Sequence, residues 1–436
     1  MLMTLFLKEC RQMAKCLTYY VVVICIIFMY TTQIGSEGVI RKPQPGQKDY
    51  GFTISEDKTV IMNQTLITLS REYYSNNYST YPFAFLKKVT LNDAKQAQIG
   101  GILAKAAGME KKELDERLKA YFAVTYLNTN TNNVTDESQK IKSETTDQKG
   151  ITDKKKPSVI LPAVSEEITY HYFTKLMTKA DKLLGGGSSY AKDKLQGNAY
   201  VPMTYEQAMA EYNDIIKNDH LSGAYARLFC DYIGIVLAIL PVFLIVTRCL
   251  RDRRAKANEI IYSRRASSVQ IMISRYLATV IMLLIPIILL ACFQTVECIY
   301  VGKKEGIAID YLAYFKYIGG WILPTILIVT SIGAFFTELT DSAIAIIIQG
   351  LWWIVSVMSG KLMGNSGWNL IPRFNTLGKY QIFRENFNQL VINRISYTIA
   401  AIVVLLMTIY IYELKRKGMV NIRGKIFSNR KIKSEA

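Results

Sequence analysis

The sequence predicts a mainly α-helical, polytopic six-helix membrane protein with an inserted extracytoplasmic domain of mixed α and some β structure. Half of its 436 residues are hydrophobic, and long uninterrupted apolar runs recur along the chain. A run of about 20 apolar residues is long enough to cross a bilayer as a helix, which satisfies its own backbone hydrogen bonds in lipid. The six predicted spans are Leu17–Ile34, Leu228–Thr247, Tyr276–Val296, Tyr317–Phe336, Ala343–Gly360 and Ile395–Tyr412.

The N-terminal segment 1–34 is expected to hold an amphipathic helix followed by the first span. Lys8, Arg11 and Lys15 precede the apolar run, which is also the pattern of a cleaved signal peptide. The run ends in "TTQIGSEG", which offers no convincing cleavage site between small residues. We therefore expect a retained anchor.

The charges of the loops predict that both termini are cytoplasmic. The inner segments 1–16, 248–275, 337–342 and 413–436 would carry three, eight, zero and eight Lys or Arg. The short outer loops, 297–316 and 361–394, would carry three and five. Short cationic loops stay on the cytoplasmic side of the membrane, so this orientation is preferred over its inverse. The same rule accounts for the basic tail 419–436.

The long segment 35–222 then lies outside the membrane. It has 25 basic and 23 acidic residues, so the net charge of +18 belongs mainly to the membrane half. This balance argues against nucleic-acid binding, which needs a basic face on a folded module. None of the seven cysteines falls in this segment, but its size allows a core without disulfides. Residues 127–157 are polar and charged, which predicts a flexible insertion.

Local patterns predict a few elements within the segment 35–222. Asn92 is placed to cap a helix through "DAKQAQIGGILAKAAG", and Thr204 with Gln207 forms a capping-box pattern before "AMAEYNDIIK". The stretches "VTLND" and "PSVILPAV" suggest short strands.

The chain shows no pattern typical of an enzyme. Its two histidines, His171 and His220, have no nearby cysteine or histidine ligands. The motifs HExxH, GxSxG, CxxC and the Walker motif GxxxxGK[ST] are all absent from the sequence. We expect no enzymatic activity, no metal and no cofactor bound by this chain.

Charged residues near the span ends are the next candidates for function. Arg227 and Asp231 lie four apart at the outer start of the second span, on one helical face. Such residues are either interfacial anchors or part of a substrate path. Kinks are expected in three spans, at the following positions: Pro241, Pro286, Pro324 and the pair Gly319-Gly320.

A basic stretch, 248–275, separates the second and third spans. It contains "NEIIYSRRASSVQIMISRYLATVI", a short helical pattern with an acidic residue and a Ser-Arg turn before the third span. The N-terminal "LFLKECRQMAKCL" is amphipathic, and the last outer loop is apolar enough to dip into the membrane. Together with six spans from 223–418 and 1–34, this layout resembles the permease subunits of ABC-2-type ABC transporters. The family's Gly-Thr after the glutamate is Ile260-Ile261 here, and no proline follows Ser263.

The resemblance implies a permease subunit of an exporter driven by a separate ABC ATPase, which would bind the ATP. It further implies a coupling helix made of Glu259, Ile260, Ile261, Tyr262, Ser263, Arg264 and Arg265. A second permease, as a homodimer or heterodimer, and membrane lipid are the other expected partners, in a bacterial plasma membrane. The substrate could be a drug, peptide, lipid or ion. The alternative is a membrane sensor or scaffold whose extracytoplasmic domain binds a ligand or an envelope component.

Overall fold

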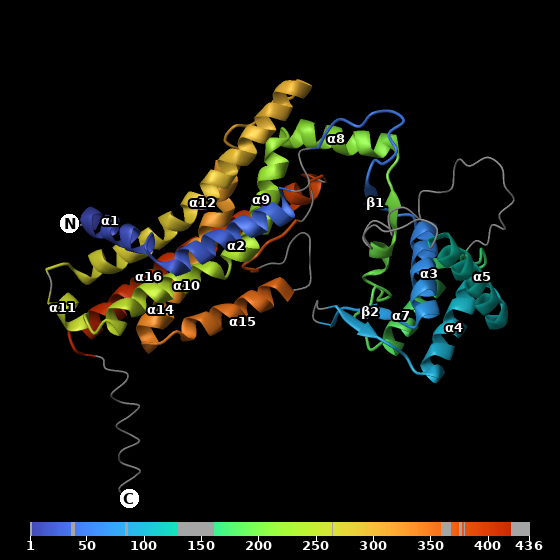
Figure 1. Ribbon diagram of the computed structural model, residues 1–436, viewed down its shortest axis with the longest axis horizontal. Coiled ribbons are helices and arrows are strands. Elements are labelled where there is room, and N and C mark those ends of the chain that lie inside the picture. The colour runs from blue at the N-terminus through green and yellow to red at the C-terminus, as the bar shows by residue number, and fades with distance from the viewer. Residues whose placement is uncertain are drawn as a thin grey trace, which may run out of the picture. The chain divides into compact units, whose positions relative to one another are not determined.

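The computed structural model describes residues 2–35, 40–82, 86–129, 161–263, 265–358, 368–374, 377–378 and 380–419. This part of the chain is mainly helical with a few short strands, as the sequence predicts (Figure 1). The chain divides into two compact units, one of Met1–Lys42 with Met209–Ala436 and one of Pro43–Ala208. Within the described residues, the helices that are long and apolar enough to cross a membrane belong to the first unit.

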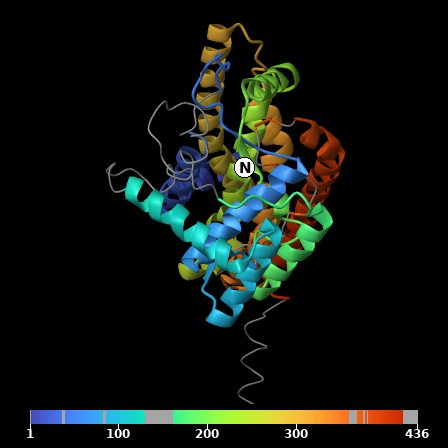
Figure 2. The ribbon, with the colours of Figure 1, turned by 90° about the vertical axis from the view of Figure 1, so that its right-hand side faces the viewer.

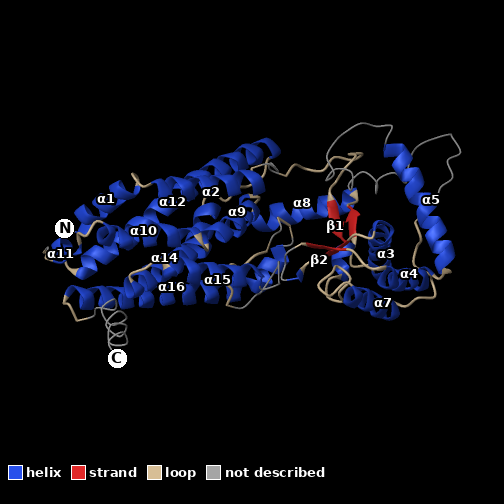
Figure 3. Cartoon of the chain, turned by 60° about the horizontal axis from the view of Figure 1, so that its bottom comes forward, coloured by secondary structure: helices blue, strands red, loops and turns tan. Residues whose placement is uncertain are grey.

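Two bent helix pairs form part of the first unit. Amphipathic α1 (Leu2–Met13) meets α2 (Leu17–Gln33) at 73° and lies along α12 (Ser268–Glu305), as Figure 3 shows. The second pair, α9 (Ser222–Leu237) and α10 (Leu240–Arg254), bends by 42°. Pro241 lies in the first turn of α10, where it needs no helical hydrogen bond, so the kink predicted there is confirmed.

The remaining helices of the first unit are α-helical except for one π-helical turn. α8 (Tyr205–Asp219), which belongs to the first unit from Met209 onward, precedes α9, and short α11 (Asn258–Tyr262) precedes α12. After α12 come α13 (Ala313–Tyr317), the π-helix η3 (Ile318–Ile322) and α14 (Leu323–Thr340), followed by α15 (Ile344–Met358) and α16 (Tyr380–Arg416). The π-helix contains the Gly319-Gly320 pair, so the backbone irregularity expected there takes the form of a wider helical turn.

Three described helical segments are long and apolar enough to cross a membrane, and the count rises to five if each bent pair is one span. The three are Ser268–Glu305, Ala313–Thr340 and Tyr380–Arg416. α15 is apolar but has only 15 residues, and the end of the predicted span Ala343–Gly360 lies outside the described residues. The sixth span therefore stays a prediction.

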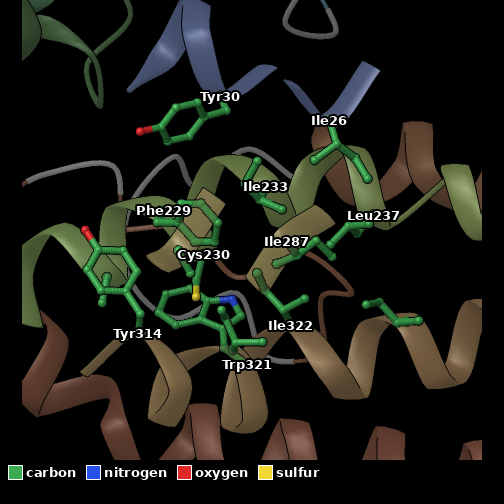
Figure 4. Packing of buried hydrophobic residues seen from close by; sticks show 14 of the residues in the cluster. Ile26, Tyr30, Phe229, Cys230, Ile233, Leu237, Ile287, Tyr314, Trp321 and Ile322 are labelled. Atoms are coloured by element: carbon green, nitrogen blue, oxygen red, sulfur yellow. The ribbon is translucent and has the colours of Figure 1, made fainter. Parts of the chain in front are cut away.

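The core of the first unit lies where α2, α9, α12 and the segment from α13 to α14 meet (Figure 4). Phe229 lies between Tyr30 and Tyr314, with edge-to-face ring contacts of 6.3 and 5.7 Å between centroids. The hydroxyl of Tyr30 donates a hydrogen bond to Oε1 of Gln294 at 2.5 Å. This contact satisfies two polar groups that would be costly to bury alone.

The second unit is a small helical domain with two short antiparallel strand pairs (Figure 2). Its helices are α3 (Lys58–Ser75), α4 (Asp93–Ala107), α5 (Lys111–Thr129), α7 (Tyr170–Leu183) and the 3-10 turn η2 (Leu195–Asn198). β1 (Phe52–Ile54) pairs with β4 (Tyr200–Pro202), and β2 (Tyr78–Thr80) pairs with β3 (Lys87–Val89). Leu66, Ile99, Leu103, Phe173 and Met177 are fully buried in its core.

Both predicted helix caps are confirmed. The side chain of Asn92 accepts a hydrogen bond from the backbone N–H of Lys95 at 3.0 Å, at the start of α4. Thr204 and Gln207 exchange hydrogen bonds between side chain and backbone at 3.0 and 3.3 Å, before α8. The capping patterns therefore predict the starts of both helices.

Two other expectations are wrong in part. Residues 161–164 of "PSVILPAV" form no strand, because Leu161 and Val164 pack on the core and the N–H of Val164 donates to Asn63 Oδ1 at 2.9 Å. In "VTLND", only Val89 belongs to a strand. The expected flexible insertion 127–157 begins inside α5, which continues to Thr129, and its residues 130–157 lie outside the described part.

Candidate functional site

The short helix α11 lies at the end of the bundle near the N-terminus, between α10 and α12 (Figure 1). α10 stops at its C-cap Ala255, and Lys256 adopts the left-handed backbone conformation with φ +52°. α12 starts at Ser267, whose side chain forms a capping box with Gln270. The two caps isolate α11 as a separate five-residue element.

The predicted docking residues divide into exposed and supporting ones. The side chain of Ile260 is 61% exposed, which is high for an isoleucine. Ile261 and Tyr262 are half-buried against the cluster formed by the ends of α10, α12, α14 and α16. The Tyr262 ring meets the Tyr412 ring edge-on at 5.7 Å between centroids.

The rest of the predicted set lies around this helix or outside the described part. The Ser263 hydroxyl donates to the carbonyl of Ile260 at 2.9 Å, and Arg265 is exposed. The side chain of Glu259 and all of Arg264 lie outside the described residues. An exposed apolar side chain on a supported short helix is suited to contact another protein.

Arg416, at the end of α16, holds the segment that contains α11. Its Nε donates to the carbonyl of Tyr262 at 3.0 Å, and its Nη1 donates to the carbonyl of Ala266 at 2.7 Å. Beside it, the Ser268 hydroxyl donates to the carboxylate of Glu413. From the sequence, Arg416 is only one of the cationic residues of the inner segment 413–436, because contacts made 150 residues away leave no local pattern.

A first ion-pair network joins α10, α14 and α16 beside this segment. Arg253 pairs with Glu338 at 2.7 Å between Nη2 and Oε2, and it also pairs with Asp341. Lys415 contacts Asp341 and the carbonyl of Glu338. The side chain of Glu338 is 1% exposed, so its charge depends on these cations.

A second network joins α1, α10 and α12 at the same end of the bundle. Glu9 of α1 pairs with Arg248 and lies 3.7 Å from Arg275, which also pairs with Asp252. Gln12 accepts hydrogen bonds from Arg248 and Arg251. Several basic residues of the stretch 248–275 thus hold helices together, in addition to favouring a cytoplasmic position of the loop.

Arg227 and Asp231, the candidates for a substrate path, lie on α9 and do not pair with each other. Arg227 forms a two-pronged ion pair with Asp219 at 2.6 and 2.9 Å, and its guanidinium lies 4.9 Å from the ring centroid of Phe383. Asp231 accepts a hydrogen bond from the N–H of Phe374 at 3.0 Å. Both side chains are almost fully buried, so the structure assigns them contacts inside the bundle.

A cavity of about 390 Å³ adjoins the Arg227–Asp219 pair, between the start of α9, the α13–η3 segment and the start of α16. Sequence reasoning missed it, because its lining comes from three distant segments. The one local signal is the Gly319-Gly320 pair, which predicts a kink and lies in the π-helical turn. Among the described residues, no group of three or more His, Cys, Asp or Glu side chains could hold a metal ion.

The comparison with protein families agrees with the helical layout. The model of the family described as "ABC-2 family transporter protein" matches residues 16–374, most of the chain. The chain belongs to this family. Neither a curated protein nor a solved structure matches it.

Membership confirms the resemblance deduced from the layout. The matched range of this ABC-2 transporter chain includes the long segment between α2 and α9, and it includes α11. ABC-2 permeases are membrane components without a catalytic centre, and they normally work with a separate ABC ATPase. The chain is therefore the permease type of subunit.

Proposed function

We propose that the chain is the membrane-spanning subunit of an ABC exporter and that α11 is its contact with the ATPase. The observation that carries the proposal is the exposed Ile260 on a helix whose other apolar side chains, Ile261 and Tyr262, are held by the bundle. An apolar side chain that enters a cleft on a partner is a common anchor of protein interfaces. Ser263 and Arg265 supply polar groups around it.

The support beneath α11 is suited to passing on a movement. Arg416 joins the α11 segment to α16, and the networks of Arg253 and Arg248 join α10 to α14 and to α1. A displacement of α11 would therefore act on several helices at once, because their ends are tied by buried charges that are costly to separate. ATP binding and hydrolysis on the partner would supply the displacement.

The proposed orientation places α11 in the cytoplasm, where ATP is available, and Pro43–Ala208 outside. The distribution of Lys and Arg among the short loops supports it. Family membership favours a transporter over a sensor or scaffold. Export, a bacterial plasma membrane and pairing with a second permease subunit complete the proposal.

Ile260→Asp tests the docking helix. The side chain is exposed, so the variant should fold, whereas a carboxylate pressed into an apolar interface without a partner costs several kcal/mol. We expect normal yield and melting temperature of the permease, with loss of the copurifying ATPase. Tyr262 is unsuitable for the same change, because its ring packs on Tyr412.

Met419→Asp is the matched control, since Met419 is also an exposed apolar residue and follows α16 near the same end. It should retain the ATPase. Ile260→Val, which keeps an apolar side chain, should also retain it. An Ile260→Asp permease that copurifies with the ATPase in wild-type amount would refute the docking assignment.

A further inference from the structure

The cavity at the predicted outer end of the bundle has the composition of a binding site. Its volume of about 390 Å³ falls in the range of ligand pockets, which are mainly apolar with a few placed polar groups. The aromatic side chains that line it are Tyr317, Trp321, Tyr380, Phe383 and Phe387. Aliphatic Leu390 and Val391 extend this surface along α16.

The aromatic wall is built on an irregular but well-supported backbone. Tyr317 directly precedes the π-helical turn and Trp321 lies within it, and such turns are frequent at functional sites. The buried guanidinium of Arg394 fixes that turn by donating to the carbonyl of Trp321 at 3.3 Å and to Thr325 Oγ1 at 2.7 Å. The pocket is therefore largely preformed, which reduces the entropic cost of binding.

The charges deep in the wall are already engaged. Both Nη atoms of Arg227 donate to the carboxylate of Asp219, and the Arg227 guanidinium stacks on Phe383. The hydrogen-bond donors of Arg394 are likewise used by Asn393 and by backbone carbonyls. A ligand therefore meets a mainly apolar interior there, in which most hydrogen-bond donors of the two arginines are already used.

The rim of the pocket differs, because it carries an exposed pair of opposite charges. Lys316 Nζ lies 2.7 Å from Asp310 Oδ2, and their side chains are 64% and 33% exposed. Such surface pairs contribute little stability, so each partner can exchange the other for a ligand group of opposite charge. Asn218 and His220 add polar groups beside them.

We propose that this pocket binds a zwitterionic amphiphile of the outer leaflet, with its apolar body against Trp321, Phe383 and Phe387. Its cationic group would lie at Asp310 and its anionic group at Lys316. The inference deepens the proposed function, on which it rests, by naming the class of molecule that is exported. The pocket would then hold the molecule at the outer side of the membrane.

Two neighbouring glycines provide the test. Gly320 lines the pocket, and a side chain added there meets no atom within 4 Å of its Cβ, so Gly320→Leu should fill the cavity without a clash. Gly319 precedes it in the same π-helical turn, is equally open and does not line the pocket. Gly319→Leu is therefore a matched control for the effect of the substitution on the helix.

The binding assay uses the purified permease in a non-ionic detergent, titrated with photoreactive phosphatidylethanolamine. We expect saturable labelling of the peptide that contains Phe383 and Phe387. Gly320→Leu should weaken it about tenfold or more, whereas Gly319→Leu should leave it unchanged. Photoreactive phosphatidylglycerol, the anionic counterpart, should give only unsaturable labelling.

Equal labelling of the wild type and Gly320→Leu would overturn the pocket assignment. Saturable labelling by the anionic probe at equal affinity would overturn the zwitterionic assignment. No ATPase is present, so these results do not depend on the docking of α11. A separate experiment tests the transport role. Phosphatidylethanolamine should stimulate ATP turnover by the ATPase reconstituted with wild-type or Gly319→Leu permease. Failure to stimulate the wild type would overturn the claim about the exported class, even if binding is confirmed.

Discussion

The buried carboxylate of Glu338 lies 2.7 Å from Nη2 of Arg253, and this pair joins the end of α14 to the end of α10. Arg253 also pairs with Asp341 at the turn between α14 and α15, and Lys415 of α16 reaches the same turn. Arg253 is the second-last residue of α10, the helix that leads into the α11 segment. Basic residues of the stretch 248–275 thus form ion pairs that link the helices of the bundle.

Arg253→Met should destabilise this end of the bundle. Removing one partner of a buried ion pair leaves the other charge poorly compensated, and we expect a loss on the order of 3 kcal/mol, reduced by the remaining cation Lys415. Thermal unfolding in detergent measures the change. Arg254→Met removes the neighbouring exposed arginine and should leave the melting temperature unchanged. Equal melting temperatures for the two variants would contradict the network.

Arg416 should be irreplaceable by lysine. Its Nε and Nη1 bridge two carbonyls, those of Tyr262 and Ala266, and a single ammonium cannot reproduce this fork. We expect Arg416→Lys to leave the yield intact but to speed amide hydrogen exchange in the α11 segment and to weaken retention of the ATPase. Lys417→Met, which removes an exposed neighbour, is the control. Unchanged exchange in Arg416→Lys would show that the α11 segment is held by its apolar contacts alone.

The sequence predicts the features of this fold that depend on neighbouring residues. Apolar runs identify the long helices, Pro241 marks a bend, and Asn92 and Thr204 mark helix starts. These signals are local, because a helix and its cap are formed within a few residues. They also place α11 and the exposed Ile260 between two long helices.

The partners of the charged residues could not be predicted in this way. Arg227 and Asp231 share a helix face, but Asp219 returns to Arg227 because His220 and Leu221 adopt positive φ angles of 46° and 57°. Asp231 instead meets Phe374, 143 residues away. Such contacts depend on tertiary packing, which periodicity does not encode. For the same reason, the aromatic pocket was missed.

The second unit should lose stability at alkaline pH. Burial and the hydrogen bond to Asp115 raise the pKa of Tyr73 to about 12, and burial beside Glu72 raises the pKa of Tyr190 well above its ordinary value. A raised pKa in the folded state favours the neutral phenol, so its contribution is complete below pH 10, the ordinary tyrosine value, and is lost as pH rises through the folded value. Thermal unfolding of the second unit should therefore shift to lower temperature above pH 10.

Tyr73→Phe should reduce the slope of this alkaline loss, because the substituted ring cannot ionise. It also removes the hydrogen bond to Asp115, so its stability at neutral pH should be somewhat lower. Tyr172→Phe, at a side chain that is 46% exposed, should reproduce the wild-type slope. Absorbance of tyrosinate during the pH titration reports the ionisation directly, and early ionisation of all tyrosines in the folded protein would contradict the prediction.

The orientation of the chain can be tested with cysteines at exposed positions. Arg265→Cys in the α11 segment, Lys304→Cys near the end of α12 and Lys119→Cys in the second unit are introduced singly. The background lacks the four native cysteines that are not buried: Cys10, Cys16, Cys25 and Cys292. An impermeant thiol reagent applied to sealed cells should label positions 119 and 304, whereas position 265 should react only after the membrane is opened.

The two outer positions test different parts of the argument. Position 119 reports on the second unit alone, whereas position 304 follows a helix of 38 residues whose rise of about 57 Å exceeds the bilayer core of about 30 Å. If position 265 is labelled in sealed cells, α11 faces outward and cannot meet an ATPase in the cytoplasm. Labelling of 119 without 304 would keep the exterior domain but show that the end of α12 is shielded or inside. Labelling of both, with 265 protected, places α11 and the aromatic pocket on opposite sides of the membrane, as the proposed orientation requires.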